Sequence, residues 1–388
     1  MNTSNFKQTE IGLIPEIWEV VKLGEVANYI NGYAFKPSNW GRTGLPIIRI
    51  QNLTDKTKPF NYYSGELEDK YKVKPGDILI SWSASLGTFR WEHGEAWLNQ
   101  HIFKVDVNGN LANADFFYLV MKYYIDTLLS KTRGTTMKHI VKKEFENSKI
   151  PLPPLEEQQK IARVLSTIQR AVEHQDKIID AVRKLKKSLM HTLFTEGLDG
   201  EEQKETEVGR VPKNWGVVRL GDVATLQRGK DLPKAKRKKG NYPVVGSNRI
   251  VGYHDQYVAI GPGVLVGRSG SVGKTFYIES AYWPLNTSLW VKDFHGNYPK
   301  FVYYLFTTFD FTRYSTGVSV PTLNRNLIHP IKIPLPPLPE QQQIAHILST
   351  VDKKIEVEER MKATLKELFK TMLHKLMSGE IRLKDVDI

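Results

Sequence analysis

The sequence predicts an α+β protein in which two globular mixed α/β domains are separated by two long antiparallel coiled-coil-like helices. The first observation behind this prediction is a repeat: residues 150–168 return as residues 333–351, with 14 of 19 positions identical. The second is a shorter repeat that follows Trp18 and Trp215, where Val-(Lys/Arg)-Leu-Gly-(Glu/Asp)-Val-Ala occurs twice, 197 residues apart. The period is too long for a solenoid, and it leaves room for a domain of roughly 150 residues before each helix. We therefore expect an internal two-fold repeat.

Composition narrows the class of protein. The chain of 388 residues is 40% hydrophobic, which supports folded cores, but it contains no apolar run of about 18 residues that could span a membrane. Residues 1–7 lack the apolar stretch of a signal peptide. Without cysteine, the chain has no disulfide, thiolate nucleophile or cysteine-type zinc site. These features predict a cytoplasmic protein.

The two globular segments, residues 1–150 and 206–333, are predicted to share one mixed frame. Each contains a Pro-Gly turn before a short apolar strand, then a small-residue loop, then an amphipathic helix. Leu98-Asn99 in the first segment also matches Leu285-Asn286 in the second. Because the loops diverge while the frame repeats, we expect two sites of one kind that bind different targets. The matched stretches are 73–80, 83–87 and 116–129 in the first segment, and 259–266, 269–273 and 301–311 in the second.

The two helical segments, residues 151–205 and 334–388, are predicted to begin after proline-rich entries. From Ile161 and from Ile344 the apolar positions step by four and three residues, which is typical of a coiled-coil seam. The helices are expected over about residues 155–196 and 338–377, and each would measure roughly 60 Å at about 1.5 Å per residue. We expect an antiparallel pair that acts as a rigid spacer, with one globular domain at each end. The packing residues expected in this pair are Leu165, Ile168, Val172, Ile179, Val182, Leu348, Val351, Ile355, Leu365 and Met372.

Basic charge is concentrated in the globular segments. The net charge is +13; residues 206–333 hold 18 basic against 7 acidic residues, whereas residues 1–149 hold 19 against 16. Both helical segments are close to neutral. DNA binding requires a basic surface beside hydrogen-bond donors, while neutral helices suit protein partners. The densest cluster comprises Arg228, Lys230, Lys234, Lys236, Arg237, Lys238 and Lys239, for which a solvated lysine-rich loop remains the alternative.

The stretches that resemble catalytic or metal-binding motifs lack the spacing that those motifs require. Residues 267–275 resemble a phosphate-binding P-loop, but five residues instead of four separate Gly267 from the pair Gly273-Lys274. The matching place in the first repeat lacks the lysine. The ten histidines show no metal-ligand spacing, and no methyltransferase or dinucleotide-binding motif is present. We therefore expect no catalytic residue, no metal site and no enzymatic activity in this chain by itself.

The repeated blocks resemble a known family. The block Leu-Pro-Pro-Leu-x-Glu-Gln-Gln-x-Ile-Ala occurs twice. Each copy follows a domain that begins with Pro-x-x-Trp and the shorter repeat described above. This arrangement resembles the specificity (S) subunit of type I restriction-modification systems, and the resemblance covers essentially the whole chain. It implies that residues 1–150 and 206–333 are target-recognition domains, and that residues 151–205 and 334–388 are the central and C-terminal spacer repeats that dock partner subunits.

The resemblance also implies partners. A subunit of this family binds double-stranded DNA with a bipartite, asymmetric target, together with two modification (methyltransferase) subunits and two restriction (translocase/nuclease) subunits. S-adenosylmethionine for adenine methylation, and ATP with Mg²⁺ for translocation and cleavage, would belong to those partners, so no cofactor is expected in this chain and no membrane partner. The alternative that the charge pattern leaves open is a self-contained DNA-binding regulator without enzymatic partners.

Candidate DNA-binding residues follow from side-chain chemistry alone. Arginine and lysine pair with guanine, asparagine and glutamine pair with adenine, and serine or threonine pair with several groups. In the first domain the candidates are Lys36, Arg42, Arg49, Gln51, Asn52, Trp82, Ser83, Ser85, Arg90, Lys138 and His139. In the second they are Arg228, Lys230, Arg237, Ser247, Asn248, Arg249, Arg268, Ser269, Ser271, Lys274, Thr322, Asn324 and Arg325.

Overall fold

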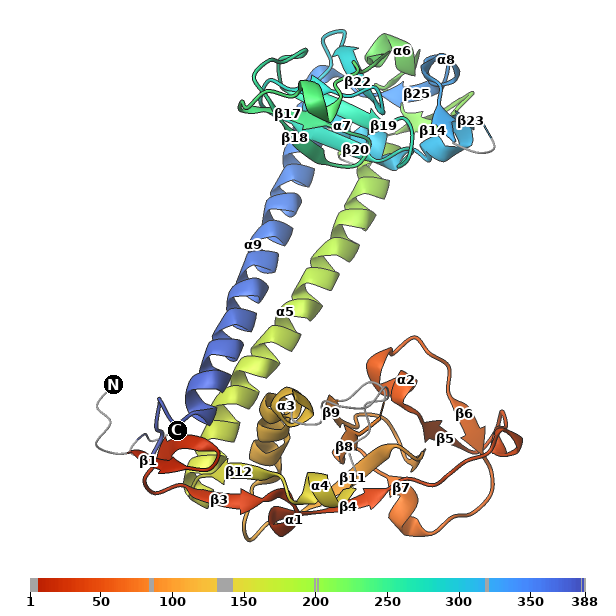
Figure 1. Cartoon of the computed structure of the whole chain (residues 1–388). Helices are drawn as coiled ribbons and strands as arrows, with labels where there is room; N and C mark the ends of the chain where they lie inside the picture. The colour runs from red at the N-terminus through yellow and green to blue at the C-terminus, as the bar shows by residue number, and fades with distance from the viewer. Residues whose placement is uncertain are drawn as a thin grey trace. The chain divides into compact units, whose positions relative to one another are not determined.

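The chain folds as two compact units. The first comprises Met1–Gln175 with Met361–Ile388, and the second comprises Asp176–Arg360. In each unit, strands and short helices accompany a part of both long helices (Figure 1). The computed structural model describes residues 6–83, 87–130, 142–198, 200, 202–317, 321–384 and 386.

Four antiparallel strands form the main sheet of the first unit. Their order is β4-β11-β8-β9, and helix α3 packs beside β9. Phe116 and Phe117 of α3 share a core with Phe103 of β11, with Trp18 and with Ile161 at the start of a long helix. The sheet and the helix therefore bury one common apolar interior. The bounds are β4 Ala27–Asn31, β8 Ile78–Ser81, β9 Gly87–Arg90, β11 Ile102–Val107 and α3 Ala114–Ser130.

A smaller sheet, of order β6-β5-β10-β7, lies in the same unit and contains the parallel pair β5/β10. Ile48, Val73 and Leu98 are fully buried in its core. Further short elements connect the two sheets and the entry to the long helix, where β3 pairs with β12. The bounds are β1 Phe6–Thr9, β2 Gly12–Pro15, β3 Glu19–Lys22, α1 Leu23–Val26, η2 Pro37–Asn39, β5 Leu45–Ile48, α2 Ile50–Thr54, β6 Asn61–Tyr63, η3 Asp69–Tyr71, β7 Lys72–Val73, β10 Ala96–Leu98, α4 Lys142–Glu146 and β12 Lys149–Leu152.

The second unit repeats this plan. Its main sheet has the order β16-β22-β19-β20, and its smaller sheet, β18-β17-β21, again contains one parallel pair. β15 pairs with β25 as β3 pairs with β12. The bounds are β13 Gln203–Thr206, β14 Gly209–Pro212, β15 Gly216–Arg219, α6 Leu220–Val223, β16 Thr225–Arg228, η4 Lys234–Lys236, β17 Tyr242–Val245, β18 Ile250–His254, β19 Gly263–Gly267, β20 Thr275–Ile278, β21 Trp283–Pro284, β22 Ser288–Asp293, α7 Pro299–Thr308, η5 Phe311–Tyr314, β23 Ser315–Thr316, β24 Thr322–Leu323, α8 Arg325–Ile328 and β25 Lys332–Leu335.

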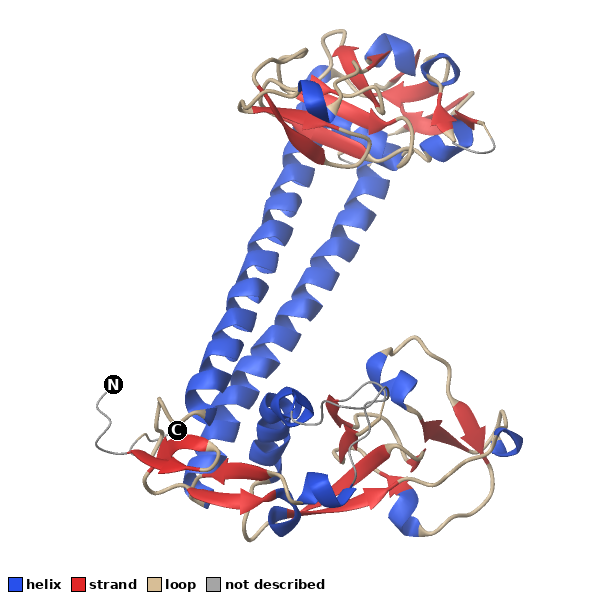
Figure 2. Ribbon diagram, viewed as in Figure 1, coloured by secondary structure: helices blue, strands red, loops and turns tan. Residues whose placement is uncertain are grey.

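The two long helices are continuous (Figure 2) and have almost the predicted bounds, α5 Leu155–Thr195 and α9 Leu338–Met377. Within the second unit, the ion pairs Arg183–Glu359 (2.5 Å) and Lys186–Asp352 (2.6 Å) join them in antiparallel order. This confirms the predicted fold class. Of the predicted packing residues, Leu165, Val172, Ile179 and Leu348 are buried, while Ile168, Val182, Val351, Ile355, Leu365 and Met372 are half-buried. Which of them contact one another across the pair stays a prediction.

The repeated Glu-Gln-Gln block fastens each long helix to its domain. The Nε1 of Trp18 donates to Glu157 at 3.0 Å, and the Nε1 of Trp215 donates to Glu340 at the same distance. The next residue satisfies loop backbone: the Oε1 of Gln158 accepts from the N–H of Asn113 at 2.8 Å. These buried polar side chains therefore connect each long helix to its domain, and each has hydrogen-bond partners. We call the glutamate–tryptophan pair with its further partners the fastener of a unit.

The same role recurs in the second unit. The Oε1 of Gln341 accepts from the N–H of Tyr298 at 3.0 Å, and its Nε2 donates to Asn297 at 2.8 Å. In the first unit the fastener has one more component, because Arg382 donates twice to Glu157, at 2.7 Å each. The backbone of Leu383 donates to the same carboxylate at 3.3 Å. The segment after α9 thus closes onto the first domain.

Within residues 73–80 the expected turn before a short buried strand is present, because Gly76 has φ +97° and β8 follows it. Other details differ from the sequence-based expectations. The expected helix 301–311 ends at Thr308, and a 3₁₀ turn follows in which Asp310 accepts from the N–H of Thr312. The predicted borders separate globular from helical segments, whereas the two compact units each contain parts of both. These borders therefore stay a prediction. No helix in the described part of the chain is long and apolar enough to cross a membrane.

Candidate nucleic-acid interface

One edge of the main sheet in the second unit gathers four strand ends. β16 ends at Arg228 and β19 ends at Gly267, while β22 begins at Ser288 and β20 begins at Thr275. The registers place these residues in a row, since Arg228 lies opposite Leu289 and Gly267 lies opposite Ser288. The loops that leave these ends therefore emerge side by side, and most sequence candidates of this domain lie on them.

Arg268 is fixed at this edge by its backbone and its side chain. Its N–H donates to Thr287 and its C=O accepts from the N–H of Leu323, both at 2.8 Å. Its guanidinium donates to the C=O of Asn286 at 3.3 Å, and the side chain is half-buried. Burial lowers the pKa of Arg268, and the charge of Arg228 lowers it further. The edge thus holds two guanidinium groups that repel each other.

Gly267 draws the neighbouring loops together. A Cβ at this position would lie 2.0 Å from the C=O oxygen of Ser271 and 2.4 Å from that of Ser247, so no larger residue fits. Ser269 forms a bridge with Thr322. The predicted candidates Ser247, Ser269, Ser271 and Thr322 are consequently held around the base of Arg268, and all four are half-buried.

The loop that resembled a P-loop belongs to a hairpin. It connects the antiparallel strands β19 and β20, with Gly267 donating to the C=O of Lys274 at 2.7 Å. A phosphate-binding P-loop joins a strand to a helix, so this loop between two strands is not a P-loop. Lys274 is exposed where this loop enters β20 and is available to an anion from outside the chain.

Exposed polar and basic residues surround the edge. Arg325 donates to the C=O of Leu226 at 3.4 Å, next to the end of β16, and Asn324 caps α8. Arg237 is the exception in the basic cluster, because its Nη1 donates to the C=O of Val251 at 2.8 Å and supports the loop from within. The exposed members are Arg228, Lys230, Lys234, Lys236, Lys238, Lys239, Asn248, Arg249, Lys274, Asn324 and Arg325.

The matching edge of the first unit has different chemistry. Backbone bonds define the equivalence: Trp82 donates to the C=O of His101 as Arg268 donates to Thr287. The indole of Trp82 stacks on the ring of Phe103, with centroids 5.6 Å apart and an angle of 23° between the planes, and its Nε1 donates to Asn31 at 3.2 Å. Residue-type reasoning overlooked Asn31, although the offset of 197 residues aligns it with Arg228.

The hydrogen bonds also correct one sequence match. Tyr33 donates to the C=O of Leu98, and Lys230 donates to the C=O of Pro284, each at 2.8 Å. Leu98 therefore corresponds to Pro284, and Asn99 to Leu285, one residue earlier than the sequence comparison suggested.

The other candidates of the first domain fall into three groups. Lys36 and Arg42 are exposed and Gln51 is half-buried, while the Arg49 guanidinium lies 4.6 Å from the ring centroid of Trp40; all four flank the smaller sheet. Asn52 and Ser83 are buried, and Asn52 accepts from Arg49 N–H and donates to the C=O of Lys58 and Pro59, so it supports its own loop instead of a ligand. Ser85, Lys138 and His139 lie outside the described residues.

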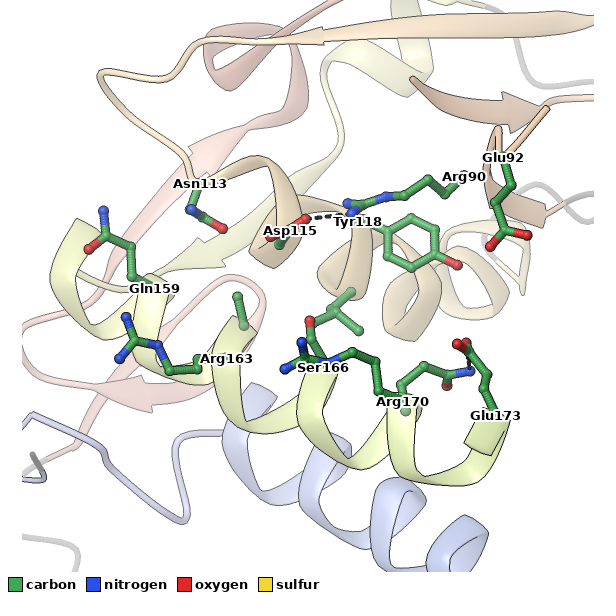
Figure 3. Close-up of a pocket in the computed structure, with 13 residues that line it drawn as sticks. Arg90, Glu92, Asn113, Asp115, Tyr118, Gln159, Arg163, Ser166, Arg170 and Glu173 are labelled. Carbon is green, nitrogen blue, oxygen red and sulfur yellow. Dashed lines mark hydrogen bonds and ion pairs between the residues drawn. The ribbon is translucent and has the colours of Figure 1, made fainter. Parts of the chain in front are cut away.

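Arg90 lies away from this edge, at the far end of β9. It pairs with Asp115 at 2.6 Å, and its guanidinium lies 5.0 Å from the ring centroid of Tyr118. Figure 3 shows these residues facing Arg163 and Arg170 of α5 across a pocket of about 560 Å³. The structure therefore places the predicted DNA contact Arg90 in a charged pocket between α3 and α5. In the described residues no group of three or more histidine, aspartate or glutamate side chains could hold a metal ion.

Comparisons with known proteins agree with this architecture. The family model described as "Type I restriction modification DNA specificity domain" matches residues 15–184 and 212–367. The chain is 26% identical to the type I restriction enzyme MjaVIII specificity subunit of Methanocaldococcus jannaschii, over 99% of this chain and 97% of that protein. It is 28% identical to the putative MjaX specificity subunit of the same organism, over 98% and 97%. The solved S subunit from M. genitalium has a similar fold, with a TM-score of 0.63 at 20% identity and coverage of 92% and 96%.

Proposed function

Because the chain belongs to the type I restriction modification DNA specificity family, we propose that its two domains each bind one half of a bipartite, asymmetric DNA sequence. The chain is the specificity subunit of a type I restriction-modification system; such subunits recognise DNA and are not catalytic by themselves. The alternative of a self-contained regulator has no support among these relatives.

The observation that carries the bipartite proposal is the unequal pair of sheet edges on one repeated frame. The same backbone bonds position Trp82 and Arg268, and the same strand end positions Asn31 and Arg228. Identical frames with identical edges would favour a symmetric target. Different side chains at equivalent positions favour two different half-sites, since base identity is recognised through the donors and acceptors that a side chain presents.

We propose that the two nearly neutral helical segments carry the protein partners. Two modification subunits and two restriction subunits would bind one specificity subunit, in keeping with its two repeated helical segments. S-adenosylmethionine, ATP and Mg²⁺ would be bound by those partners. A cytoplasmic location stays a prediction from composition.

Isolation of the tagged chain from its native cells tests the assembly. A methyltransferase should copurify at about two copies per specificity chain, together with a translocase. A preparation that contains only this chain, while still binding DNA, would favour the regulator.

Domain exchange tests how specificity is divided. Replacing residues 206–333 by the matching domain of a relative should change one half of the methylated sequence and leave the other half intact. As a matched control, four residues inserted in one long helix, about 5.4 Å, should change only the spacer, by one or two base pairs of about 3.4 Å each. Methylome sequencing would contradict the proposal if the exchange altered both halves or the insertion altered the recognised bases.

A further inference from the structure

The sheet edge of the second unit and its loops carry basic side chains of two kinds. The lysines of the basic cluster, such as Lys238 and Lys239, are exposed and have long flexible side chains. Arg268 is instead held at the base of the loops by one side-chain and two backbone hydrogen bonds. Flexible exposed cations suit phosphates, which carry no sequence information, whereas a fixed planar fork suits the edge of a base.

The electrostatics of the arginine pair leave it ready for an acceptor. Neither Arg228 nor Arg268 forms an ion pair with a carboxylate of the described chain, although other basic residues of this unit, such as Arg313 and Lys332, do. Arg228 and Arg268 repel each other, and this repulsion would be relieved by acceptor atoms placed between them. The major-groove edge of guanine offers two adjacent acceptors, O6 and N7, to which arginine binds in bidentate fashion.

Resting on the proposed function, we infer that Arg268, supported by Arg228, recognises a guanine in the half-site of the second domain. Arg268 uses one N–H on Asn286, which restrains the guanidinium and leaves its other donors for the base. In the first domain the equivalent positions hold Trp82 and Asn31, whose side chains hydrogen-bond each other. The first half-site therefore lacks this arginine–guanine contact, and the two halves of the target differ at the equivalent position.

Methylome sequencing of the complete complex tests this inference. The variants are Arg268→Gln and Arg268→Lys, with Lys292→Gln as the matched control, because Lys292 is exposed near the opposite end of β22. Both Arg268 variants should relax one guanine position, with discrimination against other bases falling by about 5- to 150-fold. The relaxed position should lie in the half that changes when residues 206–333 are exchanged, and the control should keep the full sequence.

The lysine variant separates base recognition from a phosphate contact. It keeps the positive charge and can still donate to guanine, but it loses the planar fork, so a phosphate contact would survive in full while the guanine preference would be weakened. An unchanged recognised sequence in both Arg268 variants, even with weaker methylation at every site, would overturn the inference. So would a change in the other half-site. Failure of the proposed function itself would look different, because the wild-type complex would then methylate no bipartite sequence.

Discussion

The two fasteners between domain and helix use the same tryptophan–glutamate bond but different further partners. In the second unit, Glu340 also accepts from Asn214, which belongs to the domain itself. In the first unit, Glu157 is 2% exposed and binds Arg382 from the segment after α9. The repeat thus reproduces the bond that the domain's own sequence can supply. The remaining partner is Asn214 of the domain in one unit and Arg382 of the segment after α9 in the other.

The sheet edges differ in another way. Their backbone frames share the hydrogen bonds described above, yet one edge presents an indole and an amide and the other presents two guanidinium groups. The fasteners hold the repeated frame and differ in one partner, whereas the edges differ only in side chains. This separation implies that the frame and the specificity of each domain can be altered independently.

The largest expected effect comes from removing the two glutamates. Glu157→Ala should destabilise the protein by about 3 kcal/mol or more, because it leaves the partly buried Arg382 without its carboxylate. Glu340→Ala should cost about 1 to 3 kcal/mol, since it removes hydrogen bonds from Trp215 and Asn214. Urea unfolding followed by tryptophan fluorescence measures both, with the exposed Glu367→Ala as control. Equal losses would contradict the asymmetry.

A second prediction concerns the shared frame. Gly32→Ala and Gly229→Ala should each destabilise by about 1 to 3 kcal/mol, because the new Cβ would lie 2.0 Å from the C=O oxygen of Asn99 or 2.1 Å from that of Leu285. Thermal unfolding should give similar losses for the two variants. Gly94→Ala, with no atom within 4 Å of the new Cβ, is the control. A loss in one domain alone would break the equivalence of the frames.

A third prediction concerns phosphate contacts. Replacing Lys238 and Lys239 by glutamine should weaken binding to all DNA sequences alike and reduce the slope of log affinity against log salt by about 0.9 per lost contact. The matched control replaces Lys366 and Lys370, which are exposed on α9. Fluorescence anisotropy at several salt concentrations gives the slopes. Unchanged slopes would assign the cluster to a solvated loop.

The smallest effect is a pH dependence confined to acid. Burial raises the pKa of Glu157, but hydrogen bonds from Arg382, Trp18 and Leu383 outweigh it and leave the pKa below its ordinary value. A lowered pKa in the folded state stabilises the protein above the unfolded value, about 4.3, and this stabilisation is lost as pH falls through the folded value. Glu157→Gln should remove that part of the acid sensitivity measured by thermal unfolding between about pH 3 and 6. An unaltered pH profile would show that Glu157 makes no such contribution.

Local periodicity explains why the long helices could be predicted almost to the residue. The seam is written in steps of three and four residues, and the prolines before Leu155 mark the entry. The sheet edges could be predicted only in part, because strand register joins distant residues such as Asn31 and Trp82. The offset between equivalent residues also falls from 197 at Gly32 to 186 at Trp82, which displaced the match at Leu98 by one position. Burial of Asn52 depends on the packing of its loop and left no signal in residue type.

Because Arg382 binds Glu157 from the end of the chain, the two units are completed at different times during translation. The first unit consists of two stretches, and the 185 residues of Asp176–Arg360 are translated between them. At about 5 to 20 residues per second, that interval lasts roughly 10 to 40 s. During it the first domain waits on the ribosome without Phe369, Leu376 and Arg382, which complete its core and its fastener. The domain that comes second in the sequence is thus the first to have all of its parts.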